Sequence, residues 1–312
     1  MILCCGESLI DMLPGHDTAG RPAFVPVPGG AVFNTAVALG RLGVATGYMG
    51  GLSEDFFGDQ LRGQLAEAGV DFSFDPPSPR PTTLAFVTLA DGQAKYLFYD
   101  RDSAGRMFGA EGVPAIPQTA RCLFFGGISL VQEPSGATLE AMLATGASDL
   151  PVMLDPNIRP QFIADEAAYR ARLDRMLAMA DIVKLSDEDL AWLSGEGDPE
   201  TQARAVLDRG PAIVIVSRGK DGATAYTGDR KIPLPAPLVE VVDTVGAGDT
   251  FNAGFLAGLT RLDRLDKPGL GKLDDDTLRQ ALTLGAAVAA ITVSRAGANP
   301  PWASELGGEF TS

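Results

Sequence analysis

Histidine and cysteine are scarce in this sequence, and their scarcity excludes several kinds of site. One histidine, His16, occurs among 312 residues, so no histidine cluster can bind a metal and a Ser-His-Asp triad would depend on His16 itself. Because His16 follows Pro14-Gly15, we expect it to be a solvated loop residue. The three cysteines, at positions 4, 5 and 122, have neither a disulfide framework nor metal-ligand spacing, which is typical of core residues in a reducing compartment.

Long apolar segments and a targeting sequence are also missing. No apolar run approaches the length that spans a bilayer. Residues 1–5 are too short for a signal peptide, lack basic residues and lead into Gly6-Glu7, which favours a buried strand. We therefore expect a soluble protein of the cytoplasm.

Positively charged residues are fewer than negatively charged ones. Lysine and arginine total 25 against 40 aspartate and glutamate residues, which gives a formal charge of −15. Such a surface repels nucleic acid and anionic membranes, so we expect neither as a partner. Hydrophobic residues make up 46% of the chain, enough for one large α/β domain with a small accessory piece or for two domains.

A glycine-rich segment, residues 242–251 (VDTVGAGDTF), is the strongest candidate for a catalytic site. Gly246, Ala247 and Gly248 lead into a helix whose apolar residues recur at helical spacing. A glycine turn at a helix N-terminus presents unpaired N–H groups and the positive end of the helix dipole, which together bind anions. We hypothesise that this turn cradles a transferring phosphate, while Asp249 beside it acts as the general base.

An ordinary turn followed by a helix cap explains the same residues about equally well when they are taken alone. The segment has neither the Gly-Lys-Ser/Thr of a Walker A loop nor the Gly-x-Gly-x-x-Gly of a dinucleotide fingerprint. The choice between the two interpretations therefore depends on the rest of the chain.

Two polar residues near the amino end are candidates for binding a ligand. Asp11 follows an apolar pair where we expect a strand to end, and α/β sheets bind ligands at such ends. A turn acid before Pro14 is nearly as good an interpretation of Asp11. Asn34 lies one turn into a helix predicted over residues 31–42, where an amide lowers helix propensity without adding packing. Gly30, just before that helix, would let a ligand approach the backbone.

Residues 83–89 and 95–99 predict a β-hairpin around Asp91-Gly92. The hairpin follows a stiff, proline-rich linker at residues 75–81, and with residues 21–27 it could form a small separate sheet. We interpret this sheet as a lid inserted into the main domain, with the site between the two parts.

The remainder of the chain alternates strands and helices. Such alternation predicts a doubly wound, mostly parallel sheet with helices on both faces. The expected strands are residues 44–49, 122–125, 152–155, 182–185, 213–217 and 223–226, and the expected helices are residues 55–68, 135–143, 166–179, 187–193, 201–209 and one within 273–293.

Residues 217–222 (SRGKDG) directly follow one of the predicted buried strands. A hydroxyl, a cation and two glycines at the carboxyl end of a strand suit a polyphosphate. A tight turn between two strands explains the segment equally well.

Taken together, these segments resemble the ribokinase (PfkB) family of sugar kinases. The resemblance rests on Gly29-Gly30 with Asn34 and residues 39–43 (LGRLG), and on residues 243–251 (DTVGAGDTF), in the family's order. It covers essentially the whole chain. It implies a single ribokinase-like kinase domain over residues 1–312, with a lid formed by insertions near residues 12–28 and 81–105.

Residues 1–14 and 155–160 (DPNIRP) are most similar to the bacterial fructokinases of that family. This similarity implies an ATP-dependent kinase that converts D-fructose to fructose 6-phosphate. Asp249 would be the base, and Gly246, Ala247 and Gly248 would form the anion hole for the γ-phosphoryl group. Mg²⁺ would come with ATP, and K⁺ would lie near the anion hole.

The resemblance also implies the other site residues and a mode of assembly. The lid would close on the sugar, and its apolar strands could pair two copies into a homodimer. The residues that would hold the sugar are Asp11, Gly29, Gly30, Asn34, Tyr99, Arg101 and Arg159. Those along the nucleotide would be Ser186, Asp189, Ser217, Gly219, Gly222 and Gly248, and those around the K⁺ would be Asp243, Val245, Thr292, Arg295 and Gly297.

Three places depart from the family pattern. Ser186 and Asp189 stand where the family has the Asn and Glu of an Asn-x-x-Glu motif linked to Mg²⁺ and phosphate. Pro301 stands where a serine often completes the cation site. Tyr99-Asp100 stands where kinases for 2-keto-3-deoxygluconate carry Tyr-Arg, and an aspartate would repel the carboxylate of that substrate, which favours a neutral sugar.

Alternatives of the same chemistry and of other classes stay open. A kinase for 2-keto-3-deoxygluconate or another sugar is one, because Arg101 and Arg159 could still meet a carboxylate. A sugar- or nucleotide-binding sensor without catalysis is another, although it would have had no need to keep Asp249 and its glycines. A dinucleotide oxidoreductase on a similar sheet lacks its phosphate fingerprint.

Overall fold

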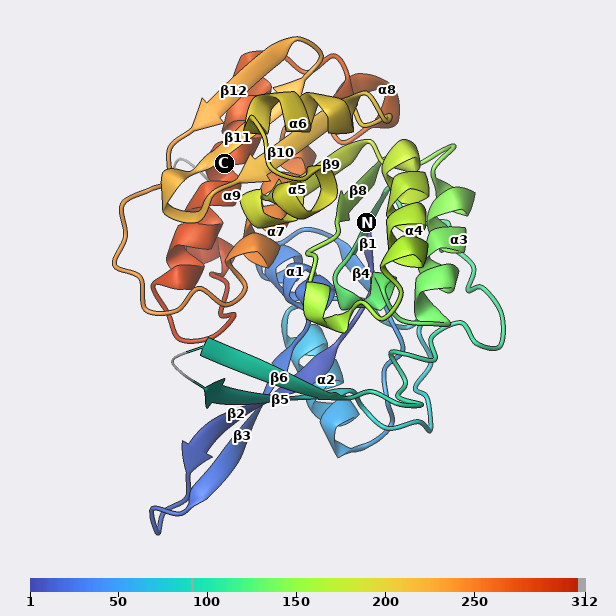
Figure 1. The fold of residues 1–312 in the computed structure, drawn as a ribbon, viewed down its shortest axis with the longest axis vertical. Coiled ribbons are helices and arrows are strands. Elements are labelled where there is room, and N and C mark those ends of the chain that lie inside the picture. The colour runs from blue at the N-terminus through green and yellow to red at the C-terminus, as the bar shows by residue number, and fades with distance from the viewer. Residues whose placement is uncertain (91–92, 308–312) are drawn as a thin grey trace.

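The computed structural model describes residues 1–90 and 93–307, with an eight-stranded and a four-stranded sheet among them (Figure 1). The larger sheet has the order β12-β11-β10-β9-β8-β7-β1-β4 and is parallel from β4 to β10, while β11 pairs antiparallel with both β10 and β12. Its strands are β1 (Ile2–Cys5), β4 (Thr46–Met49), β7 (Cys122–Gly126), β8 (Val152–Asp155), β9 (Ile182–Ser186), β10 (Ile213–Ser217), β11 (Ala223–Thr227) and β12 (Arg230–Leu234).

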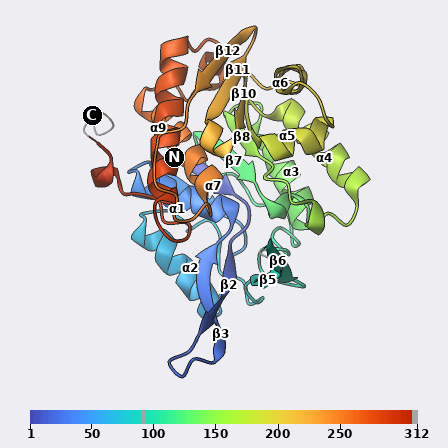
Figure 2. The same ribbon diagram turned by 60° about the vertical axis from the view of Figure 1, so that its left-hand side comes forward.

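Helices cover both faces of this sheet, as the alternating pattern predicts (Figures 1 and 2). Successive strand residues point to opposite faces, so Ile213 and Ile215 join one core while Val214 and Val216 join the other. The first core is closed by α1 (Ala31–Arg41), α2 (Phe56–Glu67), α7 (Ala247–Arg261) and α9 (Asp275–Val293), and the second by α3 (Ser135–Gly146), α4 (Glu166–Met179), α5 (Asp187–Ser194) and α6 (Pro199–Leu207).

The two long helices α7 and α9 pack closely because small residues face each other. A Cβ added to Gly254 would come within 2.7 Å of the Gly285 Cα, and one added to Gly258 within 2.7 Å of the Ala281 Cα. Close packing fixes α7 firmly, and α7 carries Asp249 in its first turn. Among the described residues, none of the helices combines the length and apolar character needed to cross a bilayer.

The second sheet has the order β3-β2-β5-β6 and contains β2 (Leu9–His16), β3 (Pro22–Gly29), β5 (Leu84–Ala90) and β6 (Gln93–Tyr99). It extends to one side of the main body, below the carboxyl ends of the parallel strands (Figure 1). The small sheet is confirmed, and β5 and β6 form the expected antiparallel pair. The turn expected at Asp91-Gly92 lies outside the described residues.

Two expectations about local structure were wrong, and one strand was missed. His16 is exposed, but it is the last residue of β2, paired with Pro22, rather than a loop residue. Asp11 lies inside β2 and not at the end of a strand of the main sheet, because the strand continues through Pro14-Gly15. The edge strand β12 was not among the predicted strands, and Pro233 lies within it. Proline is tolerated at a sheet edge, where its missing N–H costs no ladder bond.

Candidate active site

The N-terminus of α7 has the shape of an anion site. Gly246 occupies the N-cap with φ +77°, a left-handed conformation that favours glycine, and a Cβ there would come within 2.6 Å of the Ala298 Cβ. The first N–H groups of a helix have no intrahelical partner. The Ala247 N–H donates to the Thr244 carbonyl over 3.3 Å, so in the Gly246-Ala247-Gly248 turn the N–H groups of Gly246 and Gly248 are the ones offered to an anionic group, with the positive end of the α7 dipole behind them.

Asp249 is buried in the first turn of α7, with 7% of its surface exposed. The Asn34 Nδ2 on α1 donates a hydrogen bond to its Oδ2 over 2.9 Å, and the Thr35 hydroxyl donates to its backbone carbonyl over 3.1 Å. Burial raises the pKa of Asp249 to about 7; Asp155 and Glu7 also raise it, whereas Asn34 and Lys184 lower it. A carboxylate with a pKa near neutrality is suited to general-base catalysis.

A buried ionic cluster that the sequence analysis did not identify lies beside the anion site. The Lys184 Nζ on β9 donates to the Asp155 Oδ2 over 3.0 Å, and the Asn252 Nδ2 on α7 donates to the same oxygen over 2.7 Å. A Cβ on Gly248 would approach the Lys184 Nζ to 2.9 Å, so the ammonium lies directly against the anion hole. Burial lowers the pKa of Lys184, but Asp155 and Asp189 outweigh it and the net shift is upward. The lysine therefore stays charged.

A signal for Lys184 was present in the sequence. Lysine is almost never fully buried unless it is paired, yet Lys184 interrupts an apolar strand run between Ile182 and Leu185. Its 4% exposure and its pairing with Asp155, which ends the neighbouring strand β8, confirm that the charge belongs to the interior. An ionisable group inside a predicted core strand therefore indicates a candidate site residue.

The residues expected to hold the sugar fall into two groups, of which the first lies at the base of the small sheet. The Asp11 Oδ2 on β2 lies directly against Gly29, so a Cβ at position 29 would force the carboxylate to move. Burial raises the pKa of Asp11 to about 6. Gly30 has φ +110° and a Cβ there would meet the Glu7 carbonyl oxygen at 2.7 Å, so glycine is required between the sheet and α1.

The second group lies on the far strand of the small sheet and on the loop after β8. Tyr99 is exposed on β6 with its ring edge-on to Phe86, and Arg101 is exposed in the turn that follows. Arg159 is exposed after β8. The rings of Phe98 on β6 and Phe162 lie 4.5 Å apart, which brings the far strand next to the segment that follows Arg159.

Asp100 does not present an unpaired charge. The Asp100 Oδ2 accepts a hydrogen bond from the Arg106 Nη1 over 3.1 Å and another from the Gln132 Nε2. Because these donors offset its charge, Asp100 repels a carboxylate less than the sequence suggested.

The residues expected along the nucleotide lie at the ends of β9 and β10. Ser186 and Ser217 are register partners on these strands. Gly219 and Gly222 have φ values of +49° and +83°, and the Arg218 N–H donates to the Gly222 carbonyl over 2.8 Å, which closes a tight turn. Asp189 differs from the others because it is buried and both of its carboxylate oxygens accept backbone hydrogen bonds.

Asp243 joins the two segments expected to hold a cation. Its Oδ1 accepts from the Val245 N–H over 3.0 Å, and its Oδ2 accepts from the Gly297 N–H over 2.9 Å. Thr292 is buried at the end of α9, and the Arg295 guanidinium pairs with Glu305. Within residues 1–90 and 93–307 there is no group of three or more His, Cys, Asp or Glu that could hold a metal ion.

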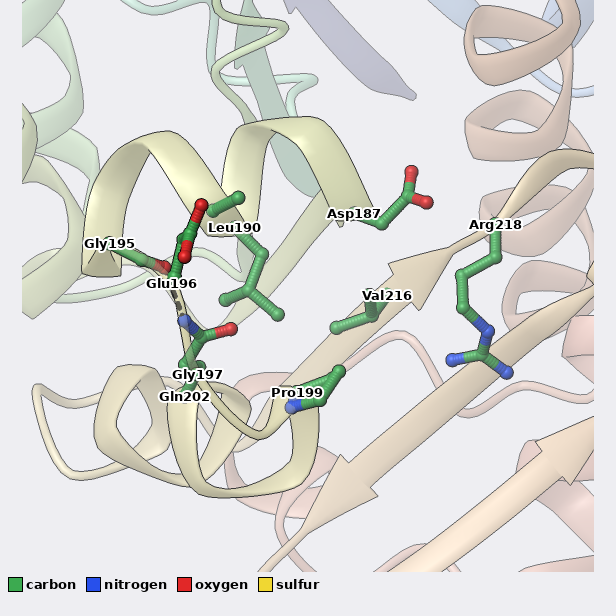
Figure 3. A pocket seen from close by; sticks show the side chains of 10 residues that line it. Asp187, Leu190, Gly195, Glu196, Gly197, Pro199, Gln202, Val216 and Arg218 are labelled. Atoms are coloured by element: carbon green, nitrogen blue, oxygen red, sulfur yellow. Dashed lines mark hydrogen bonds between the residues drawn. The ribbon is translucent and has the colours of Figure 1, made fainter.

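A cavity of about 280 Å³ lies between α5 and α6, with Leu190 and Val216 in its wall (Figure 3). Asp187 and Arg218 stand at its edge, near the end of β10. None of the expected site residues lines it. The candidate site is instead the region between the first turns of α1 and α7 and the carboxyl ends of β8, β9 and β10.

Comparisons with known proteins agree with this arrangement. Residues 1–305 match the model of the pfkB family carbohydrate kinases. The chain is 48% identical over 279 residues to a fructokinase of Rhizobium leguminosarum bv. trifolii, which covers 89% of this chain and 86% of that protein.

Two solved structures share the fold. A fructokinase with bound ATP from Xylella fastidiosa has a TM-score of 0.86 and 31% identity, covering 95% of this chain and 93% of that one. A fructokinase of Vibrio cholerae O395, in fructose, ADP and calcium ion bound form, has a TM-score of 0.81 and 25% identity, covering 95% of this chain and 94% of that one. These likenesses cover nearly the whole length of each chain.

Proposed function

Because the chain belongs to the pfkB family of carbohydrate kinases, we propose that it is a fructokinase that transfers the γ-phosphoryl group of ATP to the 6-hydroxyl of D-fructose. The chain is an ATP-dependent sugar kinase by its family and relatives. The observation that carries the proposed chemistry is the position of Asp249, buried at the N-terminus of α7 and oriented by Asn34.

In the proposed mechanism Asp249 removes the proton from the attacking sugar hydroxyl. Its Oδ2 is occupied by Asn34, so the Oδ1 is the oxygen that would receive the proton. A pKa of about 7 lets the group be ionised before the reaction and accept a proton during it. Asp249 lies in the same helical turn as Gly248, which would bring the hydroxyl and the phosphoryl group into line.

The anion hole and Lys184 would stabilise the charge on the transferring group. Phosphoryl transfer depends mainly on alignment and on fixed positive charge near the phosphoryl oxygens. The N–H groups of the Gly246-Ala247-Gly248 turn would supply one source, and the ammonium of Lys184 beside Gly248 would supply a second. Asp155 and Asn252 would hold that ammonium in place.

ATP would lie along Ser186, Ser217, Gly219 and Gly222 towards the anion hole, with Mg²⁺ bound to its phosphates. We propose K⁺ for the site near the anion hole. Asp243 supports that site because it already draws together the segments that carry Val245 and Gly297, whose carbonyl oxygens would face a cation. A cation held there would add positive charge near the phosphates.

We propose that the sugar is held by Asp11, Asn34 and Arg159, with Gly29 and Gly30 allowing it close to the backbone. The small sheet would act as a lid, with Tyr99 on β6 and Arg101 in the turn after it contributing to the sugar site. Its apolar side chains also suit pairing between two copies, since among the sheet residues whose side chains are described, Leu13, Phe24, Val25, Leu97 and Tyr99 are exposed by more than a third.

A kinase for 2-keto-3-deoxygluconate is the second candidate. Arg101 and Arg159 favour it, because either could bind the carboxylate of the keto acid. The pairing of Asp100 with Arg106 favours it too, because Arg106 offsets the negative charge that was expected to repel that carboxylate. The 48% identity to a fructokinase favours the neutral sugar.

A coupled assay of ADP release across a panel of sugars tests the proposal. The panel contains D-fructose, D-ribose, D-glucose and 2-keto-3-deoxygluconate, with Asp249→Asn as the control for contaminating kinases. The highest kcat/KM should be found with D-fructose. A higher value with the keto acid would favour the second candidate. Absence of turnover with every sugar would favour a binding protein without catalysis.

A further inference from the structure

Asp189 is placed as a bridge between two backbone segments. Its Oδ1 accepts from the Ile158 N–H over 2.8 Å, and its Oδ2 accepts from the Ser186 N–H over 3.0 Å. The Ser186 hydroxyl in turn accepts from the Asp189 N–H over 3.0 Å, which completes a capping box at the start of α5. With 3% of its surface exposed, Asp189 has little room for a further partner.

The segment that Asp189 holds is residues 156–159, here named the Arg159 loop. Asn157 in this loop has φ +45°, a left-handed conformation that asparagine adopts more readily than most non-glycine residues and that turns the chain sharply here. The Asn157 N–H bonds the Asp155 Oδ1 over 3.2 Å, and the Ile158 N–H bonds Asp189. The Arg159 Nη1 donates a hydrogen bond to the Ile158 carbonyl over 3.0 Å. The shape of the loop, and with it the position of Arg159, is thus set by buried carboxylates.

The surroundings of Asp189 do not suit a metal ion. Its carboxylate accepts hydrogen bonds from two backbone N–H groups, which carry partial positive charge. The Lys184 ammonium is also near, because the charge of Asp189 helps to raise the pKa of Lys184 against the effect of burial. A divalent cation needs further oxygen ligands and is repelled by an ammonium. The donor set therefore fits a structural bridge better than a site for Mg²⁺.

Building on the proposed sugar kinase function, we propose that Asp189 is a positioning residue that fixes the Arg159 loop to the start of α5. In this way it sets the affinity for the sugar, and not the binding of Mg²⁺ or of ATP. The bridge ties the segment beside the nucleotide, at Ser186, to a residue on the sugar side, Arg159.

Two variants separate this role from a metal role. Asp189→Asn removes the charge and turns an N–H donor towards a backbone N–H. Asp189→Glu keeps the carboxylate and can still cap α5, but its extra methylene moves the oxygen away from Ile158. Glu188→Gln, an exposed change on the same turn of α5, is the matched control.

Steady-state kinetics with D-fructose and hydrogen exchange at the Ile158 amide test the proposal together. Both Asp189 variants should raise the fructose KM by about tenfold, because the buried Ile158 N–H loses its acceptor. The KM for Mg·ATP and the Mg²⁺ dependence of the rate should stay within about twofold of the wild type. Exchange of the Ile158 amide should become about tenfold faster in both, and the control should match the wild type.

An increased KM for Mg·ATP with an unchanged fructose KM would overturn the positioning role, as would unchanged exchange at Ile158. If Asp189→Asn fails to fold, Asp189→Glu decides the question. If the wild type does not phosphorylate fructose, the proposed function fails. Exchange at Ile158 and calorimetric binding of fructose then still test the bridge.

Discussion

The Asn34 Nδ2 donates a hydrogen bond to the Asp249 Oδ2 over 2.9 Å, although the two residues are 215 positions apart in the chain. The bond joins the first turns of α1 and α7, which pack side by side against the main sheet (Figures 1 and 2). It fixes the orientation of a buried carboxylate before any substrate is bound. In the proposed mechanism this preorganisation leaves one oxygen of Asp249 for the sugar hydroxyl.

Replacing Asn34 should weaken the base in a specific way. The hydrogen bond from Asn34 favours the ionised form of Asp249, so Asn34→Ala should raise the pKa of Asp249 further above its already elevated value. We expect kcat to fall by about tenfold or more and the acid limb of the kcat/KM profile to move to higher pH. Thr35→Ser, which keeps the hydroxyl that bonds the Asp249 carbonyl, should change neither.

The charges beside Asp249 should move the same pH profile in opposite directions. Because the base acts in its ionised form, wild-type kcat/KM should rise with pH through about 7. Lys184→Met removes a cation that favours ionisation, so the rise should shift to higher pH and kcat should fall by about 10²-fold or more. Asp155→Asn removes an anion that opposes ionisation, so the rise should shift to lower pH. Equal profiles for these two variants would contradict the assigned geometry.

The buried charge of Asp249 should cost stability at neutral and alkaline pH. Burial raises the pKa of Asp249 in the folded state to about 7, from an ordinary value of 3.8. The unfolded chain therefore loses this proton first, and the free energy of unfolding falls as pH rises between the two values. Asp249→Asn removes the effect, so its Tm should exceed that of the wild type by a few degrees near pH 8 and by much less near pH 4. Thermal denaturation at the two pH values checks this.

The proposed potassium site gives a separate prediction. Replacing K⁺ in the assay by a tetraalkylammonium ion, which is too large to be held between Val245 and Gly297, should lower kcat several-fold. Asp243→Ala removes the carboxylate that bridges the two segments, so its residual activity should no longer depend on the choice of cation. A variant that kept the full potassium response would exclude Asp243 from the site.

The fold could be predicted largely from the sequence because local patterns and tertiary structure agree. Residues 213–216 are continuously apolar and buried on both faces of the sheet. Gly254 and Gly258 of α7 meet small residues of α9. The prediction failed where tertiary context overrides local signals. Pro14-Gly15 predicts a turn, yet both residues belong to β2 because they pair with Phe24 and Ala23 of β3.

The candidate site could be predicted only in part, for a related reason. Asp249 and Asn34 are recognisable because each stands in an unusual place on a helix, but their hydrogen bond joins distant segments and follows from tertiary packing alone. Lys184 and Asp155 form an ion pair because β8 and β9 are adjacent in the sheet, and the order of the strands cannot be deduced from the sequence alone. The capping contact of Asp189 with Ser186 is local, whereas its contact with Ile158 requires the fold.

Single-turnover phosphoryl transfer by Asp249→Ala tests the central claim most directly. Enzyme saturated with ATP, Mg²⁺ and D-fructose should form fructose 6-phosphate at least about 10²–10⁴-fold more slowly than the wild type, while the dissociation constants for ATP and fructose change little. Transfer at close to the wild-type rate, with both ligands bound, would contradict the assignment of Asp249 as the general base.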